Sequence, residues 1–253
     1  MTDRPAPHVI ALSLLALGLA WVAAARATGD ATIMPGPTEV WRIVLQEAAG
    51  GDLGLHIRAT LLRVAAAFSI AMAGGVALGL ALGRSPALDR WLGPWVVVFL
   101  NIPALVVIVL CYLWIGLNEV AAITAVAVNK TAMVAVTIRE GVRALDPKVA
   151  DMAASYRMSA WARLAHVTWP QLWPYIASST RNGLAIIWKI VLVVEFLGRG
   201  NGVGFQIHLY FQLFETGYVL AYALSFVAVM LVVEYGLLQA WESRATRWRR
   251  AAA

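Results

Sequence analysis

Long apolar stretches separated by short polar ones dominate the chain. Each stretch has about 17 to 25 residues, the length that an α-helix needs to cross roughly 30 Å of hydrocarbon. The pattern therefore predicts an all-α integral membrane protein with about six transmembrane helices. The predicted spans are Val9–Ala25, Leu61–Leu82, Leu92–Ile115, Val120–Ile138, Tyr175–Leu197 and Val219–Ala240.

The composition supports a membrane protein and excludes several other classes. Of the 253 residues, 61% are hydrophobic and 13% are charged, against about 25% charged residues in a typical soluble domain. The net charge is +6, but the basic residues lie at the ends of apolar stretches, which argues against nucleic acid as a partner. The single cysteine and four scattered histidines predict no disulfide, no metal centre and no catalytic site of these residues.

The positions of Lys and Arg predict the orientation, because positively charged loops resist translocation. Basic residues bracket the turn after the second span at Arg84 and Arg90, fill the loop 139–173 and close the chain. These segments are predicted to be cytoplasmic, as are both termini. The first apolar run could also be a signal peptide, but we treat it as a retained span of one transmembrane domain covering residues 1–253.

The loop 139–173 is long enough to carry structure of its own. Asp146-Pro147 suits the start of one short helix, and Ser159 suits the cap of a second, which should end at Pro170 and Pro174. Apolar residues recur at helical spacing in both: Val149, Met152, Ala153 and Tyr156, then Trp161, Leu164, Ala165 and Thr168. Two short helices with exposed apolar side chains predict a docking surface for another protein.

Five segments together resemble a known family. The positions Asp146-Pro147, Asp151-Met152-Ala153, Tyr156, Ser159, Trp161 and Pro170 resemble the cytoplasmic Glu-Ala-Ala (EAA) loop of binding-protein-dependent ABC importer permeases. Met34–Pro37, His56–Phe68 with Arg63, Ile102–Gly116 and the run Glu195–Phe205 are similar to other segments of the nitrate, sulfonate and taurine group. The resemblance covers most of the chain.

The resemblance implies a division of labour among subunits. The chain has no phosphate-binding loop of the Gly-x-x-x-x-Gly-Lys-Ser/Thr type, so it is not predicted to bind and hydrolyse ATP by that route. The resemblance implies that the chain is not an enzyme and binds no cofactor itself. Two separate ATP-binding subunits, with ATP and magnesium, would grip the short helices of this chain and of a second permease copy. A homodimer is the simplest arrangement, and a heterodimer is the alternative. A soluble solute-binding protein would dock outside the bacterial inner membrane and deliver a small organic or inorganic anion, such as a sulfonate, taurine or nitrate.

The same resemblance assigns the residues that couple this chain to its ATPase. They are Asp151, Met152, Ala153, Ala154, Tyr156, Arg157, Ser159, Trp161, Leu164 and Pro170. The chain departs from the family at Arg157, where the family has glycine. An arginine lacks the freedom of glycine at positive φ, so we expect the bend between the two helices to be strained or less sharp.

Charged and polar residues at membrane depth are candidates for a translocation pathway. They are Lys130, Lys189, Asn101, Asn129 and Glu195. A Lys at a helix centre costs roughly 2.5–3.5 kcal/mol on insertion, so each Lys should face the bundle interior or a water-filled path. One hypothesis is that the lysines attract an anionic substrate; the other is that they pair with Glu195 or Glu234 or extend to an interface. The asparagines also fit interhelical hydrogen bonds.

Glycines suggest two further structural features. Gly74, Gly75, Gly79 and Gly83 are predicted to allow a neighbouring helix to approach closely. The glycines between positions 198 and 204 are predicted to form a tight external turn or a re-entrant segment.

Three functional alternatives accompany the anion-importer hypothesis. The chain could import a non-anionic organic solute, or serve as a nontransporting scaffold that docks a soluble ATPase. An intramembrane enzyme is a third class, but the sequence has no reacting constellation to support it.

Overall fold

The computed structural model describes residues 7–238, and this part of the chain is helical with short connections. The helices are α1 (Pro7–Thr28), α2 (Pro37–Gly50), α3 (Asp52–Arg84), α4 (Pro86–Asn101), α5 (Ala104–Ile115), α6 (Glu119–Arg143), α7 (Pro147–Ser155), α8 (Ala160–Arg163), α9 (Trp169–Gly198), α10 (Val203–Gln212) and α11 (Thr216–Val232). Two π-helical turns, η1 (Leu164–Thr168) and η2 (Val233–Leu238), extend α8 and α11. The prediction of an all-α membrane fold is confirmed.

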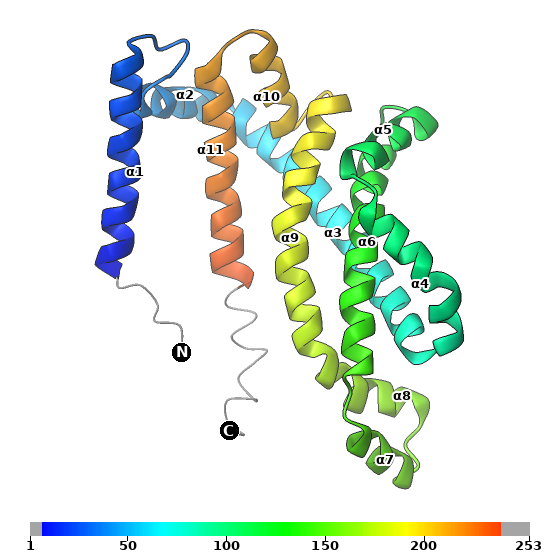
Figure 1. The fold of residues 1–253 in the computed structure, drawn as a ribbon. Helices are drawn as coiled ribbons and strands as arrows, with labels where there is room; N and C mark the ends of the chain where they lie inside the picture. Colours follow the sequence, from blue (N-terminus) through cyan, green and yellow to red (C-terminus); the bar gives the residue numbers. More distant parts are fainter. Residues whose placement is uncertain (1–6, 239–253) are drawn as a thin grey trace.

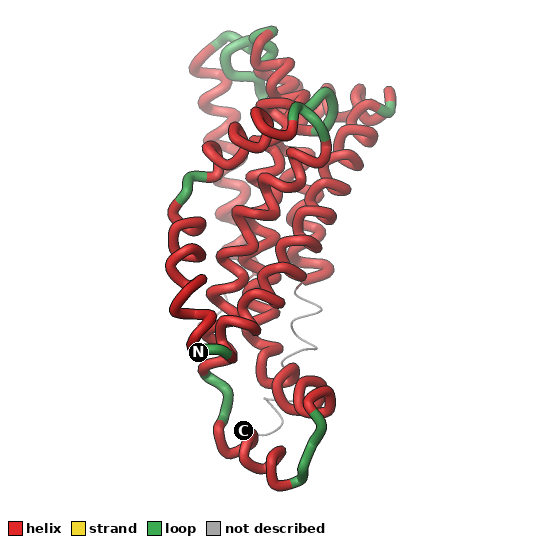
Figure 2. The backbone as a smooth tube through the Cα atoms, turned by 90° about the vertical axis from the view of Figure 1, so that its right-hand side faces the viewer, coloured by secondary structure: helices red, strands yellow, loops and turns green. Residues whose placement is uncertain are grey.

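The long helices run side by side along the molecule (Figure 1). Helices α7 and α8 lie at one end, which we call the coupling end, and α2, α5 and α10 lie at the opposite end. The view from the side shows most of the loops gathered at these two ends (Figure 2). The first residues of α1 and the last turn of α11 both point toward the coupling end.

Three helices are long and apolar enough to cross a membrane by length and composition. They are His8–Thr28, Asp52–Arg84 and Glu119–Arg143, and the bent pair α4 and α5 is a fourth candidate. The other two predicted spans correspond to α9, which has 30 residues including three charged ones, and to α11, which has 17. The end of the sixth predicted span, at residues 239–240, lies outside the described residues.

The third predicted span, Leu92–Ile115, is wrong as a continuous helix. Helices α4 and α5 meet at an angle of 98°. Pro103 causes the break, because its ring disfavours helical geometry in the residue before it, and Ile102 is extended with φ −72° and ψ 123°. The break redirects α5 toward the interior, where Val107, Ile108 and Cys111 are buried.

Helices α3 and α6 pack in direct backbone contact. A Cβ built on Gly79 would lie 2.6 Å from the carbonyl oxygen of Ala135, and one on Gly83 would lie 2.5 Å from Cβ of Val142. Gly75 faces Val134 in the same way. The predicted close approach is therefore confirmed for these three glycines, which share one helix face at a spacing of four residues. It is wrong for Gly74, where an added Cβ would make ordinary contact at 3.5 Å with Thr131.

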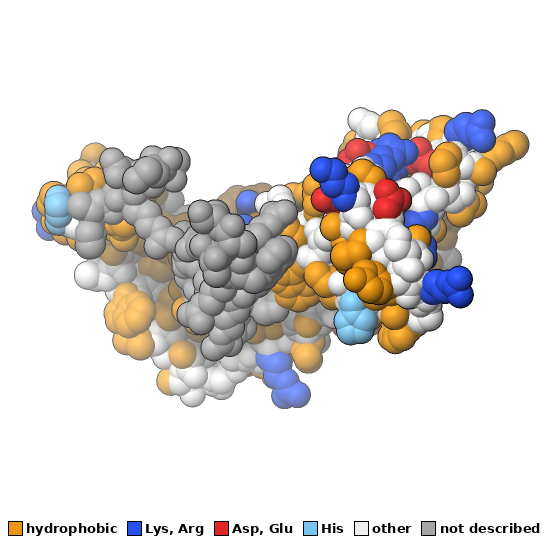
Figure 3. Space-filling view, turned by 90° about the horizontal axis from the view of Figure 1, so that it is seen from below, with side chains coloured by type: hydrophobic (Ala, Val, Ile, Leu, Met, Phe, Trp, Pro, Cys, Tyr) orange, Lys and Arg blue, Asp and Glu red, His pale blue; other side chains and the backbone are white. Residues whose placement is uncertain are grey.

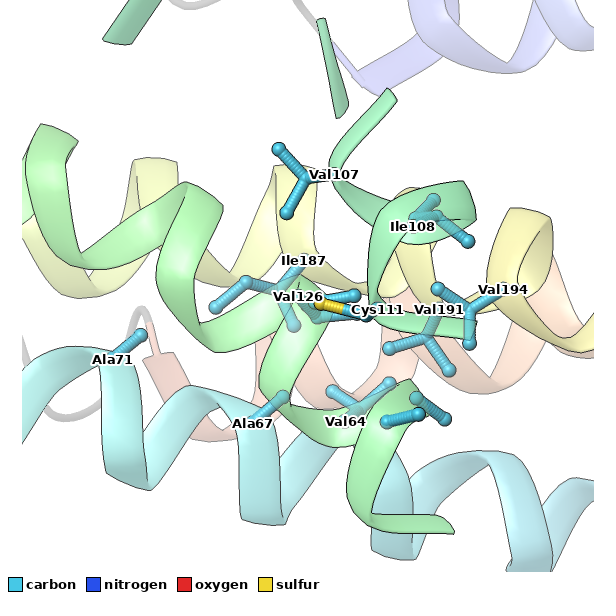
Figure 4. Packing of buried hydrophobic residues seen from close by; sticks show 13 residues of the cluster. Val64, Ala67, Ala71, Val107, Ile108, Cys111, Val126, Ile187, Val191 and Val194 are labelled. Carbon is cyan, nitrogen blue, oxygen red and sulfur yellow. The ribbon is translucent and has the colours of Figure 1, made fainter. Parts of the chain in front are cut away.

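Four helices meet in the largest buried apolar cluster (Figure 4). Small side chains line α3 at Ala67 and Ala71, and branched ones face them from α9 at Ile187, Val191 and Val194. The remaining labelled side chains come from α3, α5 and α6: Val64, Val107, Ile108, Cys111 and Val126. This packing holds α9 against the pair α3 and α6 near the middle of the bundle.

Candidate functional site

The segment between α6 and α9 forms the predicted pair of short helices at the coupling end (Figure 1). The Asp146 side chain accepts a hydrogen bond of 2.8 Å from the Lys148 amide at the start of α7. The Ser159 hydroxyl accepts one of 3.2 Å from the Ala162 amide at the start of α8. Both predicted caps are confirmed, and each satisfies a backbone donor that the first helical turn would leave unpaired.

The turn between α7 and α8 places Arg157 in the left-handed region. Its φ is +50°, while the Arg157 amide donates to Ala154 and the Met158 amide donates to Ala153. This pair of hydrogen bonds is the Schellman motif, which normally has glycine at the position that Arg157 occupies. The sequence predicted either a less sharp bend or a strained one. The structure has the sharp turn, and the backbone of Arg157 is strained. A non-glycine residue costs about 1–2 kcal/mol in this conformation.

Most of the predicted coupling residues are exposed, and a buried one holds α7 against the rest of the segment. Ala153 is fully buried, and α7 packs on η1. Tyr156 is 78% exposed and Trp161 is 76% exposed, although both are large aromatic side chains. The other exposed positions are Asp151, Met152, Ala154, Arg157, Ser159 and Pro170, while Leu164 is half-buried. The exposed positions form a surface with two protruding aromatic rings.

The second short helix does not end at the prolines, so that prediction is wrong. Helix α8 continues through η1 into α9, with Pro170 in the first turn of α9 and Pro174 inside it. In η1 the Trp169 amide donates to the carbonyl of Leu164, which widens the turn just before Pro170. A proline in a first helical turn removes no required hydrogen bond. The coupling segment is therefore joined to α9 by uninterrupted helix.

The two predicted pathway lysines occupy different environments. Lys130, near the middle of α6, is 8% exposed and makes no ion pair within residues 7–238. Lys189 is exposed on α9, and its Nζ lies 5.5 Å from the centre of the Trp188 ring. Within residues 7–238 neither lysine pairs with Glu195 or Glu234, so the ion-pair alternative is wrong, whereas extension of the exposed Lys189 to an interface stays a prediction. Glu195 is fully buried and binds Arg63 instead.

The predicted pathway residues do not form one cluster. Asn101 is exposed and bonds back to the carbonyl of Val97 at 2.8 Å within α4. Asn129 is half-buried beside Lys130 on α6. In the described part of the chain, no hydrogen bond or ion pair joins any two of the five candidates.

A partly buried polar cluster at the end opposite α7 and α8 was not predicted: Arg63 and Glu195 are buried, whereas Glu119 is 47% exposed. Arg63 of α3 lies at its centre: Nη1 is 2.6 Å from Oε1 of Glu195, and Nη2 is 2.6 Å from Oε1 of Glu119. Arg199 binds the same Glu119 at 2.7 Å, and Asn201 accepts from Arg63 through its backbone carbonyl at 2.8 Å. Two arginines and two glutamates balance in charge. We call these residues, with Thr60, the Arg63 cluster.

The Arg63 cluster fixes the glycine-rich connection between α9 and α10. The amide of Gly204 donates to Oε2 of Glu195 at 2.9 Å, and the amide of Val203 donates to the Thr60 hydroxyl at the same distance. Gly202 has φ +110°, and a Cβ there would collide with the Glu195 carboxylate. The predicted tight turn is present, and glycine is required at 202 by both conformation and space.

His56 extends this polar region without forming a metal site. Its Nδ1 accepts a 3.0 Å hydrogen bond from the Gly202 amide, and its Nε2 lies 2.6 Å from the Gln206 amide group. Because Nδ1 is an acceptor, Nε2 carries the proton of the neutral ring, and the Gln206 amide must then present its otherwise unpaired oxygen to Nε2 rather than its nitrogen. Within residues 7–238, no group of three or more His, Cys, Asp or Glu could hold a metal ion. The sequence did contain a signal for the Arg63 cluster. Arg63 and Glu195 lie in two different predicted spans, and charged side chains at membrane depth pair with one another.

Comparison with known proteins gives a consistent result. A family model described as "Binding-protein-dependent transport system inner membrane component" matches residues 73–246. The putative aliphatic sulfonates transport permease protein of Bacillus subtilis (strain 168) is 26% identical over 222 residues, or 88% of this chain and 80% of that protein. The taurine transport system permease protein of Escherichia coli (strain K12) is 26% identical over 233 residues, or 90% of this chain and 84% of that protein.

A solved structure shares the fold. It is titled "Crystal structure of an amino acid ABC transporter with histidines", and it covers 75% of this chain and 92% of its own chain with a TM-score of 0.60. At 24% sequence identity, this likeness concerns the fold alone.

Proposed function

The chain belongs to the binding-protein-dependent transport system inner membrane components, and from this membership we propose that it imports a small organic or inorganic anion, such as a sulfonate, taurine or nitrate. It is a multi-pass inner-membrane permease subunit of an ABC importer, and its family is a transport family rather than an enzyme family. The observation that supports an anion is Lys130, a buried cation on α6 without an acidic partner in the described chain. An anionic substrate would offset the cost of that unpaired charge.

Relatives support the same substrate class. The two relatives described above carry names that refer to aliphatic sulfonates and to taurine. Both substrates present a sulfonate group, which a Lys ammonium can bind as a point charge. Lys189, Asn101, Asn129 and Glu195 complete the candidate pathway, although Glu195 would act on it through Arg63.

The proposed motor is a pair of separate subunits that bind ATP and magnesium. They would dock on the exposed surface of α7 and α8, where Tyr156 and Trp161 protrude at the coupling end. Large aromatic side chains are typical anchors of protein interfaces. The single domain, the cytoplasmic position of both termini and a symmetric second copy of this chain are parts of the same proposal. The common direction of the ends of α1 and α11 supports the position of the termini.

The proposed mechanism uses the uninterrupted helix from α8 to α9. Closure of the ATPase pair would move α7 and α8, and the continuous backbone through η1 would carry that movement into α9. At its other end, α9 is tied to α3 and α6 through Glu195, Arg63 and Glu119. These three helices would therefore tilt together and change the access to Lys130. The solute-binding protein would dock at the end that carries α2 and α10.

Uptake into proteoliposomes tests this function. The vesicles would contain the complete chain with its copurified ATPase, and binding proteins loaded with taurine, an alkanesulfonate or nitrate would be added outside. We expect ATP-dependent uptake of one ligand, its loss when residues 151–165 are scrambled, and reduced uptake in Lys130→Gln with the ATPase still attached. Lys189→Gln would show whether an exposed lysine contributes.

Other outcomes would separate the alternatives. Uptake that is unchanged in both lysine variants would refute the anion pathway. An attached ATPase with no transported ligand among those tested would favour a scaffold or a non-anionic solute. If no ATPase binds, the proposed coupling surface is wrong.

A further inference from the structure

A cavity lies at the coupling end between the last residue of α3 and the second short helix. Its volume is about 430 Å³, and it is open to the surroundings. The lining residues are Arg84, Ala160, Trp161, Arg163, Leu164 and Thr168. The cavity thus joins the end of a membrane-spanning helix to the segment that carries the proposed ATPase surface.

Two arginines give this cavity an unbalanced positive charge. Arg84 and Arg163 are both exposed, and neither forms an ion pair with any residue of the described chain. Nη2 of Arg84 lies 3.4 Å from the hydroxyl oxygen of the buried Thr168, so this guanidinium contacts another residue that lines the cavity. Seen from the coupling end, the surface carries basic and acidic side chains interspersed with exposed hydrophobic ones (Figure 3).

Two acidic residues at the coupling end, Asp89 and Glu140, are bound to arginines outside the cavity. Asp89 lies 3.1 Å from Nη1 of Arg139 and 2.5 Å from Nη2 of Arg143. Glu140 binds the same two arginines at 3.0 and 3.5 Å. Asp89 and Glu140 therefore neutralise one pair of basic residues, while the pair that lines the cavity faces open space.

The surroundings of the two arginines indicate which anion would fit. Arg84 is the last residue of the candidate membrane span Asp52–Arg84, and a basic residue at the end of a span is expected to face the lipid headgroups. Trp161 and Leu164 supply apolar surface beside the charge. An arginine guanidinium binds phosphate oxygens through two parallel hydrogen bonds. We propose that this cavity binds the phosphate of an acidic phospholipid headgroup between Arg84 and Arg163, with the acyl chain against Leu164.

The position of the cavity links the lipid to coupling. Arg163 and Trp161 belong to α8, and α8 continues into α9. A bound headgroup would hold α8 against the end of α3 and limit how far the coupling segment moves. This inference does not depend on which solute the permease carries.

Lipid binding to the purified chain in a neutral detergent tests the proposal. The probe is short-chain phosphatidylglycerol, followed by calorimetric titration, with short-chain phosphatidylcholine and inorganic phosphate in parallel. Because each arginine near a headgroup contributes about 1 kcal/mol, the double variant Arg84→Gln/Arg163→Gln should bind phosphatidylglycerol about 30-fold more weakly. Arg90→Gln is the matched control, since Arg90 is an exposed arginine of α4 outside the cavity lining.

Each result supports or overturns the proposal. Weaker binding in the double variant, recovery in Arg84→Lys/Arg163→Lys and no change in Arg90→Gln would support it. Equal binding by the wild type and the double variant would overturn it. Inorganic phosphate binding as tightly as the lipid would show a site for a free anion instead. If the double variant loses its ATPase but binds the lipid as the wild type does, the two arginines belong to the partner interface and the proposal is overturned.

Discussion

Substitution of the buried carboxylate Glu195 should destabilise the bundle strongly. Its side chain has no exposed surface and accepts from three donors: Nη1 of Arg63 at 2.6 Å, and the Thr60 hydroxyl and the Gly204 amide, each at 2.9 Å. In Glu195→Gln the shape of the side chain is unchanged. Both carboxylate oxygens accept hydrogen bonds, so the new NH₂ group faces a donor in either orientation of the amide: Arg63 in one, Thr60 and Gly204 in the other. The substitution also leaves the Arg63 cluster with two positive charges and one negative charge.

The expected magnitude follows from these contacts. Breaking a buried ion pair by removing one partner costs about 3–5 kcal/mol. Because Glu119 still binds Arg63, we expect the lower end, about 3 kcal/mol. At about 2–4 °C per kcal/mol for a chain of this size, the apparent Tm of the detergent-purified protein should fall by roughly 6–12 °C.

The matched control is Glu140→Gln. Glu140 is 52% exposed and pairs with Arg139 at the coupling end. Exposed ion pairs contribute about 0–1 kcal/mol, so this variant should stay within a few degrees of the wild type. The double variant Arg63→Gln/Glu195→Gln restores charge balance with Glu119 and Arg199, and it should lose less than the sum of the two single variants. Equal Tm values for Glu195→Gln and Glu140→Gln would refute the reasoning.

Three further predictions concern the turn, the helix contact and the docking surface. Arg157→Gly removes about 1–2 kcal/mol of left-handed backbone strain but costs about 0.5–1 kcal/mol because glycine has more conformational entropy in the unfolded chain. The free energy of unfolding, measured in denaturant, should therefore rise by about 0.5–1 kcal/mol. A lower free energy of unfolding would contradict the strain at Arg157. Gly79→Ala should cost about 1–3 kcal/mol by forcing α3 from α6, while Gly74→Ala should not, as thermal unfolding would show. Trp161→Ala should weaken ATPase binding about tenfold in a pull-down titration, whereas Trp114→Ala at the opposite end should leave it unchanged.

The coupling segment could be predicted closely from local signals. Caps at Asp146 and Ser159 depend on side chains that bond to amides two or three residues away, and such contacts are visible in the order of residues. The consequence of Pro170 was predicted wrongly. Whether a proline ends a helix depends on whether the preceding turn can widen, and in η1 it does.

The distant contacts of the polar residues could not be predicted in the same way. Glu195 was considered beside the lysines because all are charged at membrane depth, but its partner Arg63 is 132 positions away in the sequence. Likewise, Gly75, Gly79 and Gly83 indicated a close approach without indicating that α6 would supply it.

The sequence by itself determined the class of the protein, because long apolar runs cannot be hidden from water by a chain of this size and must reside in lipid. It also determined the short capped helices, whose stabilising contacts are local. Only the tertiary structure decided which buried charges pair, where the third apolar run bends inward and which arginines between residues 7 and 238 remain without an acidic partner. These outcomes depend on which helices lie side by side, and the energy of a buried charge is set by its neighbours in space rather than in sequence.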